Sequence, residues 1–279
     1  LFLRMAGFSL PTRRSLVSAA ALLSAHASRF PAHAISRWSL PNGEVSLREP
    51  TFACGGSSYE APILLGAGGS GAALSVSPSS SRPAVEGERV VLKVSWSSPG
   101  ASAAVINEGA VLERLNGVNG VERLLGRCDY TAISGGGEPG DSGRVALLLS
   151  PLVEDAVDSI GALTDARMQE AATAQLASTV VAILAANICS TDLQLLIDRR
   201  TAALTVIDLT EARVMASPPS DADLAQAASF ATEARNQVPA RWLGHFQERA
   251  REEAAELARR RGPPADPEVL QAALDAVVS

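Results

Sequence analysis

A single lysine distinguishes this 279-residue chain. Among its 24 basic residues other than histidine, Lys93 is the only lysine, so arginine serves wherever a surface charge is enough. Lys93 lies in the apolar run 90–94, behind the glycine-rich stretch 64–71. An ammonium group is a compact point charge, whereas a guanidinium is a planar fork with a different reach. We therefore expect a site that needs the ammonium; the alternative is a strand lysine whose stem covers apolar surface.

The glycines ahead of Lys93 follow a G-x-G-x-x-G spacing at Gly66, Gly68 and Gly71. This spacing occurs in dinucleotide-binding folds and in loops that cover phosphates. The dinucleotide version opens a helix directly after the glycines. Here an apolar run, 72–76, and a Ser- and Pro-rich stretch, 77–83, follow instead. The pattern predicts strand–loop–strand.

Hydrophobic periodicity predicts the elements that must position these groups. Glu108, 15 residues after Lys93, lies on the first turns of a helix, and Asp192 and Asp208 bracket two short strands. We expect helices over 104–115, 168–188, 221–236, 242–261 and 267–278, the last with Asp266 as N-cap, and strands over 145–149, 195–197 and 204–207. The charged part of the fourth helix, 248–261, is expected to be a solvated face, with a partner-binding coil as the alternative.

Cysteine and histidine content excludes several kinds of site. Two of the three histidines lie in the first 34 residues, so only His245 remains and a histidine-based triad or multi-histidine metal site is excluded. Cys54, Cys128 and Cys189 contain no C-x-x-C pair. We expect neither a disulfide framework nor a zinc site from them.

The first 34 residues are predicted to be a targeting leader. Arg13 and Arg14 precede the apolar run 17–25, and small-residue motifs follow at 25–27 and 32–34, as in a secretory-type signal. The twin arginine resembles a twin-arginine export signal, and we expect a plastid location, in particular the thylakoid lumen. Mitochondrial import, secretion or a disordered tail without an address are the alternatives.

The leader also bears on membrane and nucleic-acid partners. Its apolar run is too short to span a bilayer, so no transmembrane helix is expected in the mature chain. The leader holds four arginines and no acid, so the other residues carry 20 basic and 30 acidic side chains, a net charge of −10. Nucleic acid is therefore not an expected partner.

The order of these motifs resembles the protein-kinase-like family over residues 63–215. Six segments carry the resemblance: the stretch 66–71 resembles the glycine-rich loop, 91–93 the V-A-I-K strand, Glu108 the helix glutamate that pairs with the lysine, 149–152 the gatekeeper and hinge, 187–193 the catalytic loop, and 206–210 the metal-binding D-F-G.

This resemblance implies an α+β, two-lobed protein-kinase-like fold with a shortened C-lobe. The expected organisation is a leader over 1–34, a loosely packed lead-in over 35–60, an N-lobe over 61–150, a reduced C-lobe over 151–232 and C-terminal helices over 233–279.

The resemblance also implies ATP and Mg²⁺ as cofactors and phosphoryl transfer to Ser/Thr, in which positioning and charge neutralisation dominate. By resemblance, Asp192 and Lys93 are the catalytic residues. The nucleotide-binding residues are Gly66, Gly68, Gly71, Lys93, Glu108 and Leu149, and the metal ligands are Asp208 and Gln194.

Departures from the family pattern favour a second hypothesis. Ser190 and Thr191 replace the usual His-Arg, and Leu209 and Thr210 replace the Phe and Gly of D-F-G. Only Gln194 lies between Leu193 and the next strand, where the family has four residues ending in a metal-binding Asn. The alternative to a weakly active kinase is therefore an inactive pseudokinase, a scaffold or accessory subunit of a plastid or thylakoid membrane complex.

Overall fold

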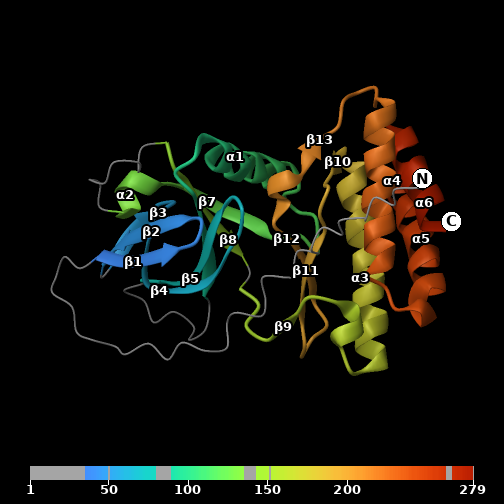
Figure 1. Ribbon diagram of the computed structural model, residues 1–279. Helices are drawn as coiled ribbons and strands as arrows, with labels where there is room; N and C mark the ends of the chain where they lie inside the picture. The colour runs from blue at the N-terminus through green and yellow to red at the C-terminus, as the bar shows by residue number, and fades with distance from the viewer. Residues whose placement is uncertain are drawn as a thin grey trace, which may run out of the picture.

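The computed structural model describes residues 35–49, 51–79, 89–134, 143–150, 152–261 and 266–278. The predicted leader, 1–34, lies outside the described residues. The chain is of the α+β class: a curled antiparallel sheet with one long helix is followed by small strands and a group of four helices (Figure 1). Among the described residues, no helix has the length and apolar character needed to cross a bilayer.

The main sheet contains six strands in the order β3-β4-β5-β6-β8-β7, with all neighbours antiparallel. Its central hairpin confirms the predicted strand–loop–strand around the glycines. The strands are β3 (Thr51–Cys54), β4 (Ser57–Ala67), β5 (Gly71–Pro78), β6 (Val90–Ser95), β7 (Arg123–Asp129) and β8 (Val145–Ser150).

The prediction of a loosely packed lead-in over 35–60 is wrong. A separate hairpin, β1 (Ile35–Leu40) and β2 (Gly43–Arg48), precedes the sheet, and β3 and β4 begin before residue 61. Val45 and Leu47 are fully buried, and Phe52 nearly so. Pro, Gly and Ser residues mark the turns between these strands, while the alternating apolar residues supply part of the core of the sheet.

Alternation along β6 decides which way Lys93 points. Val90, Leu92 and Val94 are buried inside the curled sheet, so Lys93 lies on the opposite face, since successive side chains of a strand alternate. Lys93 is paired with Leu147 of β8, which packs in the same core as helix α1 (Pro99–Arg114). Directly opposed residues share a face, so Lys93 faces α1.

Helix α1 starts earlier than the predicted residue 104 because its N-cap lies further upstream. The Ser98 side chain accepts a hydrogen bond from the Ala101 N–H, and Pro99 occupies the first turn, where its missing N–H costs nothing. Val105, Val111 and Leu112 are buried. They connect α1 to the larger core that continues into the C-terminal helices.

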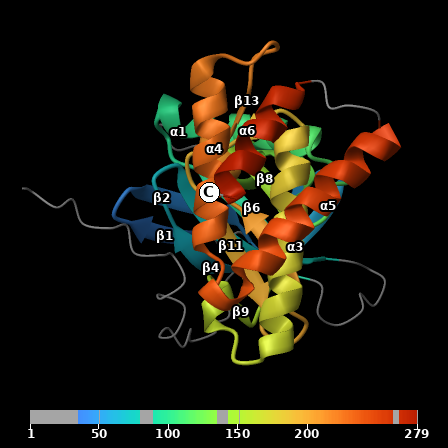
Figure 2. The same ribbon diagram turned by 90° about the vertical axis from the view of Figure 1, so that its right-hand side faces the viewer.

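Four helices form the C-terminal part, and Figure 2 shows them in front of the strands. The predicted ranges are confirmed to within a few residues, and Asp165 and Ser220 provide N-caps for the first two. The helices are α3 (Ala166–Ala185), α4 (Asp221–Asn236), α5 (Leu243–Arg261) and α6 (Pro267–Val278). The predicted domain boundary at 232/233 lies inside α4, which packs along α6.

Helix α5 buries Phe246, Ala250 and Ala254, whereas Arg259 and Arg260 are exposed and form ion pairs with Glu256. A solvated face is therefore the better description of its charged stretch.

Between the sheet and the helices lie short strands that carry the predicted acidic residues. Strand β11 pairs with β12 and β9, and β10 pairs with β13. Their bounds are β9 (Ala156–Val157), β10 (Ile188–Cys189), β11 (Gln194–Asp198), β12 (Leu204–Ile207) and β13 (Arg213–Val214). Two further short helices are α2 (Tyr130–Ser134), after β7, and the 3₁₀ turn η3 (Leu209–Glu211), after β12.

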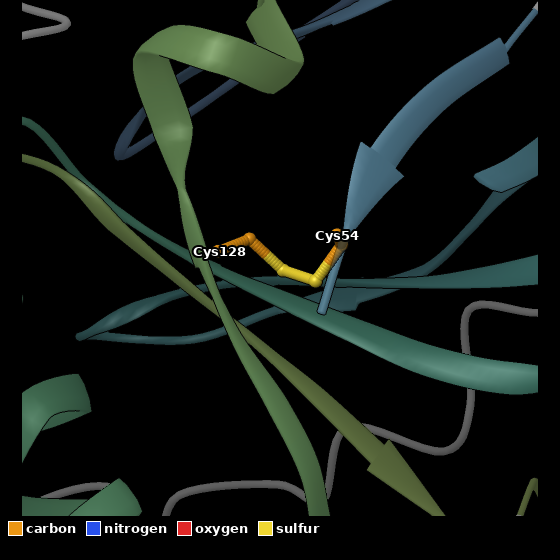
Figure 3. The surroundings of a disulfide bond; sticks show 2 residues. All are labelled: Cys54 and Cys128. Carbon is orange, nitrogen blue, oxygen red and sulfur yellow. A yellow bond between two sulfur atoms is a disulfide. The ribbon is translucent and has the colours of Figure 1, made fainter. Parts of the chain in front are cut away.

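A disulfide joins Cys54 and Cys128, although the cysteine spacing predicted no disulfide framework (Figure 3). Cys54 ends β3 and Cys128 lies in β7, the two outermost strands of the sheet, yet their Cα atoms are 5.0 Å apart. Gly55 and Gly126 meet beside the bridge, where a Cβ on Gly126 would lie 3.5 Å from the Gly55 Cα. The sheet therefore curls until its edges touch, and cysteine spacing alone cannot reveal that contact.

We predict that replacing both Cys54 and Cys128 by Ser lowers the free energy of unfolding by about 2–4 kcal/mol, because the bridge closes a loop with a sequence separation of 74 residues. Urea denaturation of the oxidised wild type and the double variant measures this loss.

Thiol titration of the wild type provides the control. Cys189 is fully buried, and burial raises the pKa of its thiol to about 11. The native protein should therefore show no reactive thiol. After unfolding without a reducing agent, it should show one reactive thiol, that of Cys189. Three thiols in the non-reduced unfolded protein would exclude the bridge.

Candidate functional site

Lys93 forms the centre of the candidate site. Its Nζ atom lies 2.8 Å from Oε1 of Glu108 and 2.7 Å from Oδ1 of Asp208. The three residues come from β6, α1 and the end of β12. The Lys93 side chain is 11% exposed and that of Glu108 is 0% exposed. The alternative of a lysine that merely covers apolar surface is therefore not supported, since both ends of this ion pair are removed from water.

The backbone after β12 turns so that Asp208 faces Lys93. Asp208 has φ 56° and ψ 61°, the left-handed region, and begins the turn η3. Thr210 Oγ1 donates to Asp208 Oδ1 at 2.8 Å. The next backbone group, the Leu209 N–H, donates to Glu108 Oε1 at 3.0 Å, so Glu108 contacts both the lysine and the turn that carries Asp208.

Glu122 is a member of the site that sequence reasoning missed. It lies between α1 and β7, and its Oε1 accepts the backbone N–H of Asp208 at 2.9 Å. The two residues are 86 positions apart. No motif or periodicity marks Glu122, because its role depends only on how this loop lies against β12.

Asp192 and Gln194 lie on the other side of Asp208. Gln194 Nε2 donates to Asp192 Oδ2 at 2.8 Å and approaches Asp208 Oδ2 at 3.4 Å. Gln194 thus presents its nitrogen, not its oxygen, to the two carboxylates. In this arrangement it is a hydrogen-bond donor between them and not the metal ligand suggested by the resemblance, because the amide nitrogen has no lone pair to offer.

The glycine turn joins β4 to β5 and is closed on itself. The Gly68 N–H donates to the Gly71 carbonyl at 2.8 Å, and the Gly68 carbonyl accepts from the Trp96 indole at 2.9 Å and from the Asn42 amide at 3.2 Å. A Cβ on Gly71 would collide with the Val94 carbonyl oxygen. That glycine is required by strand packing, whatever the turn binds.

Leu149 is 2% exposed and packs in the larger core. It pairs with Val91 of β6 and Leu124 of β7. Leu149 therefore helps to hold β8 between β6 and β7. It lies two residues along the strand from Leu147, the residue paired with Lys93. The remaining predicted site residues, Lys93, Glu108, Asp192, Asp208 and Gln194, are brought together as one linked group.

Charge in the site is unbalanced toward carboxylates, and the pKa directions reflect this. Burial acts to lower the pKa of Lys93, but the charges of Glu108 and Asp208 outweigh it and the net shift is upward. Burial alone would raise the pKa of Asp208, whereas Lys93 lowers it overall. Burial raises the pKa of Glu108 and, with repulsion from Glu108, raises the pKa of Glu122 to about 8. The ammonium is thus firmly protonated.

The carboxylates can be tested for their fit to a metal ion. Within the described residues no group of three or more His, Cys, Asp or Glu side chains forms a metal cage. Asp192 and Asp208, however, both lie within 3.4 Å of one atom, Gln194 Nε2. Mg²⁺ is commonly held by one or two carboxylates together with substrate phosphates and water, and this pair fits that arrangement.

A pocket of about 110 Å³ lies beside the site, under the C-terminal half of α1. Its lining residues are Leu112, Glu113, Leu115, Asn116, Glu122, Arg123 and Leu124. Pockets for drug-sized ligands are typically about 300–1,000 Å³, so this space is too small for a nucleotide.

No protein-family model matches the sequence, and the search of curated proteins returns no significant match.

We predict that Glu108→Ala lowers the free energy of unfolding by about 3–5 kcal/mol, because it removes one partner from a buried ion pair and leaves the Leu209 N–H without its acceptor. Urea denaturation measures the loss. The matched control is Glu113→Ala on the same helix, whose exposed pair with Arg127 should contribute at most about 1 kcal/mol. Equal losses in the two variants would contradict a structural role for the Lys93–Glu108 pair.

Proposed function

We propose that this chain has a two-lobed protein-kinase-like fold with a shortened C-lobe and binds ATP with Mg²⁺ to transfer phosphate to Ser/Thr hydroxyls. One observation carries the proposal: the only lysine lies between a helix glutamate, Glu108, and the aspartate that follows a short strand, Asp208, at 2.8 and 2.7 Å. This is the arrangement that phosphoryl transfer uses to hold nucleotide phosphates next to a metal.

The order of the strands adds support to the proposed fold. The glycine turn joins β4 to β5, the lysine lies on β6, α1 follows, and β8 lies next to β6 in the sheet. In this proposal the sheet and α1 form one lobe and the helices α3–α6 form the other, with the chain passing between them after β8.

Each residue has a physical task in the proposed reaction. Lys93 would bind phosphate oxygens, and Glu108 would hold its ammonium in place. Asp192 would accept the proton of the acceptor hydroxyl. Gln194 would orient the Asp192 carboxylate by donating a hydrogen bond to its Oδ2 atom. Asp208 would hold Mg²⁺, which neutralises phosphate charge when bound. The excess of carboxylates around one lysine makes the cation necessary, since an anionic nucleotide would otherwise be repelled.

The second candidate is a catalytically inactive scaffold, a pseudokinase, and the glycine turn favours it. Its Gly68 N–H is already used by Gly71, and its Gly68 carbonyl is held by Trp96 and Asn42. A turn that is closed on itself must rearrange before its backbone can cover phosphates. A partner in a plastid membrane complex, with a plastid or thylakoid location, belongs to this candidate and depends on the leader prediction.

Lys93 labelling separates the two candidates. Because Lys93 is the only lysine, an amine reagent has the N-terminal amine as its internal reference. The reaction is run at alkaline pH until unliganded Lys93 is measurably labelled, since Glu108 and Asp208 raise the pKa of its ammonium and slow its reaction. Mg-ATP should lower the labelling of Lys93 about tenfold at saturation while leaving the N-terminal amine unchanged. Equal labelling with and without millimolar Mg-ATP, measured by peptide mass spectrometry, would reject the nucleotide site and favour the scaffold.

The metal ligands can be tested by a pair of variants. Asp208→Asn should abolish the metal-dependent part of the thermal shift produced by ATP, because an amide oxygen carries no charge to hold Mg²⁺. Gln194→Ala should retain that shift, since Gln194 donates to the carboxylates instead of binding metal. Differential scanning fluorimetry with Mg²⁺, with Mn²⁺ and with EDTA provides the measurement. Loss of the shift in Gln194→Ala would show that the glutamine turns and binds the ion.

A further inference from the structure

Asp208 adopts a backbone conformation that it would not choose unaided. Its φ of 56° and ψ of 61° place a residue with a Cβ in the left-handed region, where the Cβ lies too close to the following carbonyl oxygen. The residue persists in this region only if its surroundings hold it there. The direction of its carboxylate toward Lys93 depends on this conformation.

Two glutamates hold consecutive backbone groups at this turn. Glu122 Oε1 accepts the N–H of Asp208 at 2.9 Å, and Glu108 Oε1 accepts the N–H of Leu209 at 3.0 Å. Glu108 also has the ammonium of Lys93 to bind, so its position is explained without the turn. The side-chain hydrogen bond of Glu122 is the one that it accepts from the Asp208 backbone.

The loop that carries Glu122 is itself fixed against two elements. The Glu122 N–H donates to the Val206 carbonyl at 3.0 Å, and the Val206 N–H donates to the Gly120 carbonyl at 2.7 Å, as a parallel bridge to β12. Thr179 Oγ1 of α3 donates to the Asn119 carbonyl at 3.1 Å. Gly120 has φ 80°, and a Cβ there would collide with Thr179 Oγ1, so only glycine lets the loop approach α3 so closely.

We propose that Glu122 is the positioning residue for Asp208: its carboxyl oxygen accepts the Asp208 N–H, fixes the left-handed turn and thereby keeps the Asp208 carboxylate against Lys93. The rigid loop explains why a single hydrogen bond suffices, because Glu122 is attached to β12 two residues before Asp208. The role of Glu122 in positioning Asp208 is argued from these contacts, whereas its effect on nucleotide binding rests on the proposed function.

Two conservative variants separate the hydrogen bond from the charge. Glu122→Gln keeps an oxygen acceptor at the same reach and removes the charge. Glu122→Asp keeps the charge and withdraws the oxygen by one methylene. Glu113→Gln is the matched control, since Glu113 lines the same small pocket but pairs with Arg127 and not with Asp208.

The first readout is the rate at which an amine reagent labels Lys93 without nucleotide. Glu122→Asp should raise this rate about tenfold, since the released turn no longer holds the Asp208 carboxylate on the ammonium. Glu122→Gln and Glu113→Gln should stay within about twofold of the wild type. Glu122→Asp and Glu122→Gln behaving alike, whether both unchanged or both faster, would overturn the proposal, because the oxygen position would then not matter.

The second readout is the dissociation constant of Mn-ATP by calorimetry, which should rise about tenfold in Glu122→Asp and not in Glu122→Gln. If the wild type binds no Mn-ATP, the proposed function fails, while the labelling result still decides the role of Glu122. If Glu122→Asp fails to fold, hydrogen exchange of the Asp208 amide is compared in the wild type and Glu122→Gln. Equal protection of this amide in the two proteins supports the proposed hydrogen bond. Loss of protection in Glu122→Gln, which keeps the oxygen acceptor, contradicts it.

Discussion

A single buried ammonium connects the three parts of this structure. Lys93 extends from the sheet, Glu108 comes from the helix that packs under it, and Asp208 belongs to the turn that follows a strand of the C-terminal part. A charge removed from water needs partners of opposite sign at hydrogen-bonding distance. Helix α1 and the turn η3 must therefore lie where Glu108 and Asp208 can both reach the ammonium of Lys93.

The sheet supplies a rigid base for that lysine. Its six strands curl until β3 and β7 meet, and the Cys54–Cys128 bridge joins these edges. This bridge limits how far the strands between the two edges can move. Lys93 lies on β6, between these edges, so its ammonium has a fixed origin from which to reach α1 and η3.

The carboxylates around the lysine are held for different reasons. Glu108 is fully buried and binds both the ammonium and a backbone N–H. Asp208 is held by its turn, and Asp192 is oriented by an amide. Carboxyl groups therefore outnumber the one ammonium that they surround, and burial together with repulsion from Glu108 raises the pKa of Glu122 to about 8.

Most of the local structure follows from short-range patterns in the amino-acid sequence. Periodicity located the helices because their apolar faces recur every three to four residues, and caps such as Ser220 act within a few residues of the groups they bind. The carboxylate of Asp266, predicted to be an N-cap, instead accepts hydrogen bonds from the distant Asn187 and Ser217. The glycine spacing also indicated the strand–loop–strand. The family resemblance, and not spacing alone, indicated Glu108 as the partner of Lys93 and Asp208 as a metal ligand; the contact between Lys93 and Asp208 was not predicted.

Other features of the protein depend on contacts between residues far apart in the sequence, so they follow only from the tertiary structure. The strands over 35–60 form because Val45 and Leu47 find a core whose other residues come from later segments. The disulfide forms because the sheet curls, and Cys54 and Cys128 give no sign of this in their spacing. Glu122 meets Asp208 across 86 residues, and Gln194 turns its nitrogen to the carboxylates only once both are in place. Short-range patterns encode elements, whereas the pairing of charges follows from how those elements pack.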